Sequence, residues 1–211
     1  MERFRTLVTR GQAEWEIKKS RFIGHAYPAL NEAEASQVID RIREEHASAT
    51  HNVFAYRIGP QPEMERFSDD GEPGGTAGAP VLEVIRRERL WNVVVVVTRY
   101  FGGIKLGAGG LVRAYSKSAM LAIQAVQTAW MAPFQRLTIM FDYPALGRLE
   151  NEMRAMGCLI EKTDYQASVA MQVLVPKEKL MAWRELVADI TAGQAQVSYQ
   201  DITYHVANGQ N

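Results

Sequence analysis

Glycine and basic side chains are concentrated in one stretch near the middle of the chain. Five glycines fall between positions 102 and 110, and no acidic residue occurs between Glu88 and Asp142. The backbone amides of a glycine-rich turn, together with the positive end of a following helix, can converge on an anion. We therefore predict an anion-binding or nucleic-acid-binding site made of Arg99, Lys105, Gly107, Gly109, Gly110, Arg113 and Lys117.

Two interpretations of this stretch remain open. The glycines either present backbone amides to phosphate, or only permit tight turns and close packing of a helix on a sheet. In the same way, Tyr100, Phe101 and Tyr115 either stack on bases or pack in the core. The spacing matches neither a P-loop nor a G-x-G-x-x-G motif, so it predicts no nucleotide specificity.

A second group of chemically active residues is the acidic loop that contains Asp69, Asp70 and Glu72. These carboxylates could serve as acid and base or hold a divalent cation, provided that the fold brings His51 or Arg57 near them. The alternative is that the aspartates cap loop amides, as is common in turns. The catalytic candidates are therefore Asp69, Asp70, Glu72 and His51. Because nothing here has the spacing of a calcium loop, we predict no metal and no cofactor.

The composition is that of a globular protein of 211 residues, with 47% hydrophobic and 23% charged residues and a formal net charge of zero. The longest apolar run, Val93 to Val97, is far too short to cross a membrane, and the charged N-terminus leads into no signal-peptide core. The single cysteine, Cys158, cannot form an internal disulfide. We therefore expect a cytoplasmic protein that does not contact membranes.

The residues with possible chemistry lie among alternating strands and helices. Five consecutive valines predict a central strand at 91–100, buried on both faces. Lys18, Lys19 and Arg21 are expected to point outward from an N-terminal strand or hairpin. The other elements expected are that strand or hairpin at 14–27, a helix at 32–45, a strand at 51–58, a long loop at 59–79, a short helix at 81–89 and a helix at 111–130.

A new cycle of elements follows Pro133, where we place the domain boundary. The pattern predicts strands at 134–143, 159–164, 167–175 and 196–206, with helices at 144–156 and 177–191. This β-α-β-β-α-β order is ferredoxin-like. The prediction is thus an α+β protein of two domains, 1–132 and 133–207.

Three segments of the first domain carry a family resemblance. They are HNVFAYR at 51–57, SDDGEPGGTAG at 68–78, and TRYFGG at 98–103 followed by LG at 106–107 and GGLVRAY at 109–115. In this order they resemble the signature of the IMPACT family. The C-terminal half is similar to the extra domain of the family's bacterial, YigZ-like members. The resemblance implies a first domain of the ribosomal-protein type, with a sheet backed by two helices.

The resemblance also implies a connection with translation, because the eukaryotic members regulate it. The leading hypothesis is a non-enzymatic, translation-associated protein that binds RNA or the ribosome through the basic glycine-rich face. One alternative is an enzyme that acts on a phosphorylated or peptidic small molecule through the acidic loop. Another is a regulator that binds a protein of the translation machinery without nucleic acid.

Overall fold

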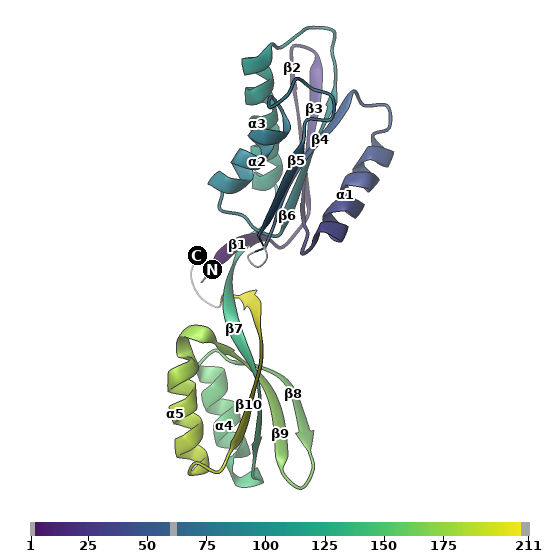
Figure 1. Cartoon of the computed structure of the whole chain (residues 1–211). Helices are drawn as coiled ribbons and strands as arrows, with labels where there is room; N and C mark the ends of the chain where they lie inside the picture. Colours follow the sequence, from purple (N-terminus) through teal and green to yellow (C-terminus); the bar gives the residue numbers. More distant parts are fainter. Residues whose placement is uncertain (1–2, 60–62, 208–211) are drawn as a thin grey trace. The chain divides into compact units, whose positions relative to one another are not determined.

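The computed structural model describes residues 3–59 and 63–207 (Figure 1). The chain forms two compact units that divide between Trp130 and Met131. The predicted α+β class with two domains is confirmed. The division falls inside a strand, β7 (Thr128–Phe141), which continues through Pro133 without a break. The sequence had suggested that Pro133 separates two elements, but the proline lies within a single strand.

The first unit is built on a five-stranded antiparallel sheet with the strand order β2-β3-β6-β4-β5. Its central strand, β6, is the valine run, and alternate valines enter different cores on the two faces of the sheet. The bounds of its strands are β2 (Gly11–Ile17), β3 (Ser20–Pro28), β4 (His51–Ile58), β5 (Met64–Ser68) and β6 (Val93–Tyr100). Strand β1 (Phe4–Leu7) belongs to the other sheet. The prediction of a central strand buried on both sides is confirmed.

Three helices cover this sheet, rather than the two that the resemblance implied. Helix α1 (Glu32–Glu45) lies on one face, while α2 (Gly78–Arg87) and α3 (Ala108–Gln124) lie on the other (Figure 1). The N-terminus of α1 is capped as the sequence predicts, because Glu34 N donates to Asn31 Oδ1 at 2.9 Å. The sheet is therefore the middle layer of three.

Two boundaries predicted for the first unit are wrong. Residues 59–79 are not a continuous loop, since they contain strand β5 at the edge of the sheet. The helix predicted at 111–130 ends at Gln124, and Thr128 to Trp130 belong to β7. Strand β5 has few apolar residues and lies at the sheet edge, whereas the residues after Gln124 continue a helical pattern that the structure does not follow.

In the second sheet, β10, β7, β9 and β8 follow one another in the ferredoxin-like order, and β1 is the fifth strand, which also pairs with β7. Its helices α4 and α5 pack on one face of the sheet (Figure 1), over a core that includes Leu137, Ile139 and Trp183. The bounds are α4 (Leu146–Ala155), β8 (Leu159–Tyr165), β9 (Val169–Pro176), α5 (Leu180–Thr191) and β10 (Gln196–Val206), with short 3-10 turns η1 (Tyr143–Ala145) and η2 (Lys177–Lys179). No helix in the described part of the chain is long and apolar enough to cross a membrane.

Candidate functional site

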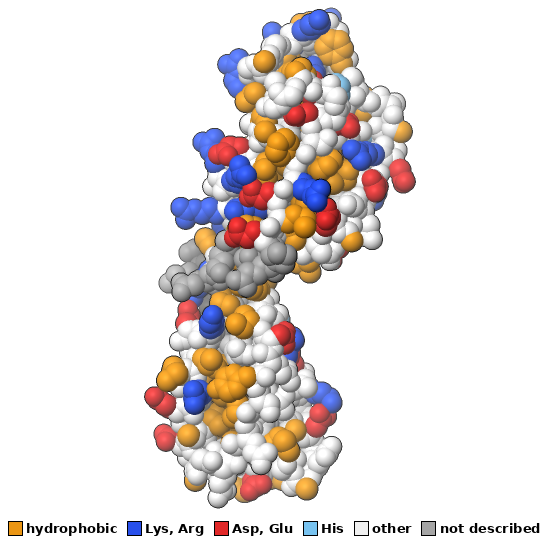
Figure 2. All heavy atoms as spheres, in the orientation of Figure 1, with side chains coloured by type: hydrophobic (Ala, Val, Ile, Leu, Met, Phe, Trp, Pro, Cys, Tyr) orange, Lys and Arg blue, Asp and Glu red, His pale blue; other side chains and the backbone are white. Residues whose placement is uncertain are grey.

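Five exposed cationic side chains lie at one end of the first unit, which we call the basic end: Lys18, Lys19, Lys105, Arg113 and Lys117. They come from the turn between β2 and β3, from the loop after β6, and from α3. Figure 2 shows Lys and Arg side chains at the upper end of this unit, beside hydrophobic ones. The exposed members of the predicted basic site therefore share one region with a hairpin turn that the sequence did not assign to the site.

Close packing holds the three parts of the basic end together. A Cβ atom on Gly102 would lie 1.9 Å from the carbonyl oxygen of Lys19, so only glycine lets the loop approach the hairpin turn. On the other side, Lys117 Nζ of α3 lies 4.2 Å from the centroid of the Trp15 ring on β2. The hairpin, the loop and the helix thus form one surface.

The glycines of the basic end divide between the two interpretations left open by the sequence. Gly102 is a packing glycine. At Gly107 and Gly109, by contrast, a Cβ would meet no atom within 4 Å. Gly107 has φ +73° and precedes α3, whose first turn has no side-chain cap. The first amides of a helix have no partner within the helix, so this uncapped turn can receive an anion.

The aromatic residues of this region also divide. Tyr115 is completely buried, so the suggestion that it stacks on bases is wrong. Phe101 is 45% exposed, and its backbone N donates to Thr50 Oγ1 at 3.0 Å. Tyr100 is half-buried, and its hydroxyl lies 3.0 Å from His46 Nδ1. Phe101 is therefore the one of the three whose ring is available at the surface.

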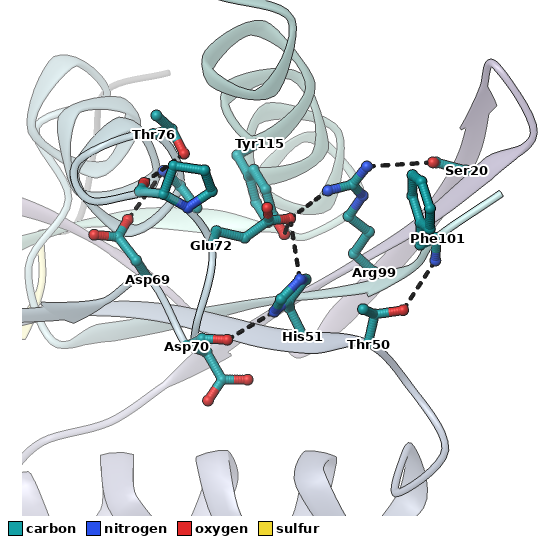
Figure 3. A network of polar contacts seen from close by, with 12 residues as sticks. Ser20, Thr50, His51, Asp69, Asp70, Glu72, Thr76, Arg99, Phe101 and Tyr115 are labelled. Atoms are coloured by element: carbon teal, nitrogen blue, oxygen red, sulfur yellow. Dashed lines mark hydrogen bonds and ion pairs between the residues drawn. The ribbon is translucent and has the colours of Figure 1, made fainter. Parts of the chain in front are cut away.

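Arg99 does not belong to the exposed surface, which corrects the prediction that its guanidinium takes part in phosphate binding. Its side chain is 5% exposed, and Nη1 donates to Glu72 Oε1 at 2.5 Å (Figure 3). The guanidinium carbon lies 5.3 Å from the centroid of the Phe101 ring. Arg99 Nη2 and the backbone N of Gly102 both donate to Ser20 Oγ, at 3.4 and 3.2 Å. Arg99 is therefore buried under the loop after β6 and contacts Ser20 and Phe101.

Glu72 is the centre of this buried network. Its side chain is 4% exposed, and the oxygen that accepts from Arg99 also accepts from the Tyr115 hydroxyl at 2.7 Å (Figure 3). Burial, followed by the negative charge of Glu72, raises the pKa of Tyr115, so this hydroxyl stays a donor. Glu72 precedes α2, Arg99 is on β6 and Tyr115 is on α3. Two of the three segments that carry the family resemblance, 68–78 and 98–115, therefore meet at one carboxylate oxygen.

His51 lies beside this carboxylate. Its Nδ1 is 2.7 Å from the carbonyl oxygen of Asp70, which can only accept, so Nδ1 carries the proton. Its Nε2 faces Glu72 Oε1 at 3.8 Å, too far for a hydrogen bond (Figure 3). The structure thus brings two catalytic candidates together. The oxygen that would act as a base is already occupied by two donors.

The two aspartates shape the loop. Asp69 accepts from the backbone N of Gly75 at 2.8 Å, of Ala77 at 3.0 Å and of Gly78 at 2.8 Å, at the start of α2. Asp70 accepts from the backbone N of Asn52 at 2.6 Å. These contacts match the capping alternative. Within residues 3–59 and 63–207, no group of three or more His, Cys, Asp or Glu side chains could hold a metal ion.

Fold and site together define a two-domain α+β protein whose first domain has a basic end built over a buried Arg-Glu-Tyr network. Residues 18–123 match the family model described as the Impact N-terminal domain. Residues 139–194 match a domain of unknown function, DUF1949. The two matches fall in separate structural units.

Similar proteins extend over most of the chain. It is 39% identical over 199 residues to IMPACT family member YvyE of Bacillus subtilis, covering 94% of this chain and 92% of that protein. It is 35% identical over 184 residues to IMPACT family member YigZ of Escherichia coli, covering 86% and 90%. The protein belongs to the IMPACT family, as the sequence predicted.

A solved structure and a human protein are also similar to this chain. A solved structure, titled as the crystal structure of an hypothetical protein, has a TM-score of 0.67 and 32% identity, and the match covers 95% of this chain and 98% of that one. Human Protein IMPACT is 37% identical over 95 residues, which are 43% of this chain and 29% of that protein. The similarity to the human protein is thus limited to less than half of this chain.

Proposed function

We propose that the protein is a non-enzymatic, translation-associated protein that binds single-stranded RNA through the basic end. The observation that carries this proposal is the convergence of five exposed cations, from a hairpin turn, a loop and a helix, on one surface. Such a surface neutralises phosphates, which supply most of the affinity in sequence-independent binding. The link to translation that the family resemblance implies supports this association, and human Protein IMPACT is similar to part of the chain.

The chemistry of the surface favours a single strand. Phe101 and Ile104 are 45% and 43% exposed among the cations, and an exposed aromatic ring can stack on an unpaired base. The uncapped first turn of α3 offers backbone amides to a phosphate. Arg99 contributes as a positioning residue, because its guanidinium lies against the Phe101 ring. Arg21 is left out of the surface because Glu14 Oε1 lies 3.3 Å from its Nε.

The contacts of the acidic loop argue for the non-enzymatic alternative. Asp69, Asp70 and Glu72 each accept hydrogen bonds that hold the loop, and the carboxylate oxygen nearest to His51 is occupied. A general base needs a free lone pair within reach of its substrate. The loop therefore acts as a support for the basic end in this proposal.

The test is RNA affinity as a function of salt, measured by fluorescence anisotropy with a short single-stranded oligonucleotide. If all five cations contact phosphates, log K should fall with log salt with a slope of about −3.5, at roughly 0.7 per contact. Lys105→Glu with Arg113→Glu should lower the affinity and reduce the slope by about 1.4. A matched control with the same charge change is Arg87→Glu with Arg154→Glu, whose side chains are exposed on α2 and α4.

Identical affinity and slope in the wild-type protein and the Lys105/Arg113 variant would show that the basic end does not bind RNA. A protein partner is distinguished by capture from extract treated with ribonuclease. Partners that remain after treatment and are lost in the same variant would assign the surface to protein binding instead.

A further inference from the structure

The second unit contains a cleft of about 510 Å³ that the proposed RNA surface does not involve. It lies where β7 ends, between the start of α4 and the segment that joins α5 to β10. Apolar atoms come from Met140, Phe141 and Ile190, and polar ones from Gln194 and Gln196. Small-molecule sites typically measure about 300 to 1,000 Å³ and combine an apolar lining with a few polar groups. The cleft has the size of such a site, and its lining combines apolar and polar residues.

Two opposite charges line this cleft, Asp142 and Arg148. Both are exposed, and within the described chain neither has an ion-pair partner. Asp142 occupies the N-cap position of η1, yet its side chain makes no capping bond. Arg148 lies in the first turn of α4, which also has no side-chain cap. One carboxylate and one guanidinium, each without an ion-pair partner in the described chain, therefore line the same cleft.

We propose that this cleft binds a free α-amino acid with an apolar side chain. Arg148 would receive the ligand carboxylate in a charge-assisted pair. Asp142 would receive the ammonium group, and Met140 and Ile190 would contact the side chain. A phosphate or dicarboxylate is disfavoured because it would meet the negative charge of Asp142, and a diamine because it would meet Arg148.

A neighbouring cleft in the second unit is lined by an arginine but by no carboxylate. It measures about 320 Å³ and lies between α5 and β10, lined by Trp183, Val187 and Tyr199 among others. Arg184 is its one charged lining residue, with no carboxylate beside it. This second cleft lacks the partner for an ammonium group. Arg184 is thus a matched control, since it is an exposed arginine on a helix of the same unit.

The experiment is isothermal titration calorimetry of the full chain with leucine, isoleucine, methionine, phenylalanine, lysine and glutamate. We expect binding of the apolar amino acids and weaker or no binding of lysine and glutamate. N-acetyl-leucine and leucine amide, which lack the ammonium and the carboxylate charge respectively, should each bind roughly tenfold more weakly than leucine or not at all.

Variants locate the binding in this cleft. Arg148→Gln and Asp142→Asn should each weaken leucine binding about tenfold or more, while Arg184→Gln should leave it unchanged. All three side chains are exposed, so the variants should fold, which circular dichroism verifies. Absence of heat and of a melting shift with every amino acid at 10 mM would overturn the proposal. Binding that Arg148→Gln and Asp142→Asn leave unchanged would overturn it equally.

Discussion

Replacement of the buried Glu72 carboxylate is the perturbation whose cost follows most directly from the structure. Glu72→Gln keeps the shape of the side chain and removes the negative charge beside Arg99. Since Arg99 is 5% exposed, its guanidinium would stay buried without a counter-charge. Removing one partner of a buried ion pair costs roughly 3 to 5 kcal/mol. We expect a loss of that size in the free energy of unfolding of the first unit.

The assay is urea and thermal unfolding of the full chain, with hydrogen exchange of β6 and α3 amides to assign the loss to the first unit. In a unit of this size 1 kcal/mol corresponds to roughly 3 to 5 °C, so the midpoint should fall by about 10 °C or more. The control is Arg21→Gln, which breaks the exposed pair between Arg21 Nε and Glu14 Oε1, 3.3 Å apart, with side chains 48% and 49% exposed. Such a pair contributes about 1 kcal/mol or less.

A double variant separates charge from packing. Glu72→Gln with Arg99→Met removes both buried charges and should be more stable than Glu72→Gln alone, because the uncompensated charge is gone. A Glu72→Gln protein within 1 kcal/mol of the wild type would refute the reasoning that the Arg99–Glu72 pair holds the loops together. The same result would favour a role for this carboxylate as a catalytic acid or base.

Two further predictions concern pH and the glycines. Burial, and then the charge of His46, lowers the pKa of His25 to about 4, so on acidification the unfolded chain takes up a proton at this histidine before the folded chain does. The free energy of unfolding should therefore fall by about 2 kcal/mol from pH 7 to pH 5, as measured by urea titration. A fall of the same size in the His25→Gln variant would contradict this assignment. Gly102→Ala should destabilise the first unit by about 2 kcal/mol or more, because the added Cβ would clash with the carbonyl of Lys19. Gly109→Ala should preserve stability and weaken RNA binding. Unchanged RNA binding by Gly109→Ala would exclude a contact between RNA and the backbone at this position.

Much of the fold follows from local pattern. The central valine strand, the capped helix α1 and the ferredoxin-like order were all predictable, because their apolar periodicity is strong. Strand β5 was not, since Met64 to Ser68 has only two apolar side chains and forms the sheet edge. The end of α3 was missed because the small and apolar residues after Gln124 continue a helical pattern. Tertiary pairing decides those segments.

The candidate site was predictable only in part. Lys105, Arg113 and Lys117 are exposed as expected, because they lie on a loop and on the outer side of a helix. The burial of Arg99 depends on Glu72, which lies 27 residues earlier and reaches it only after the loop folds. A count of charges along the chain therefore overstates the basic surface. A buried partner distant in sequence is the reason.

The meeting of two signature segments at one oxygen of Glu72 changes how genetic results at these positions should be interpreted. A cell carrying a substitution at Glu72, Arg99 or Tyr115 would contain less folded protein, whatever the protein binds. Loss of a phenotype there reports abundance, so immunoblotting has to precede any functional conclusion. Substitutions of exposed residues such as Lys105, which leave that junction intact, are the informative alleles.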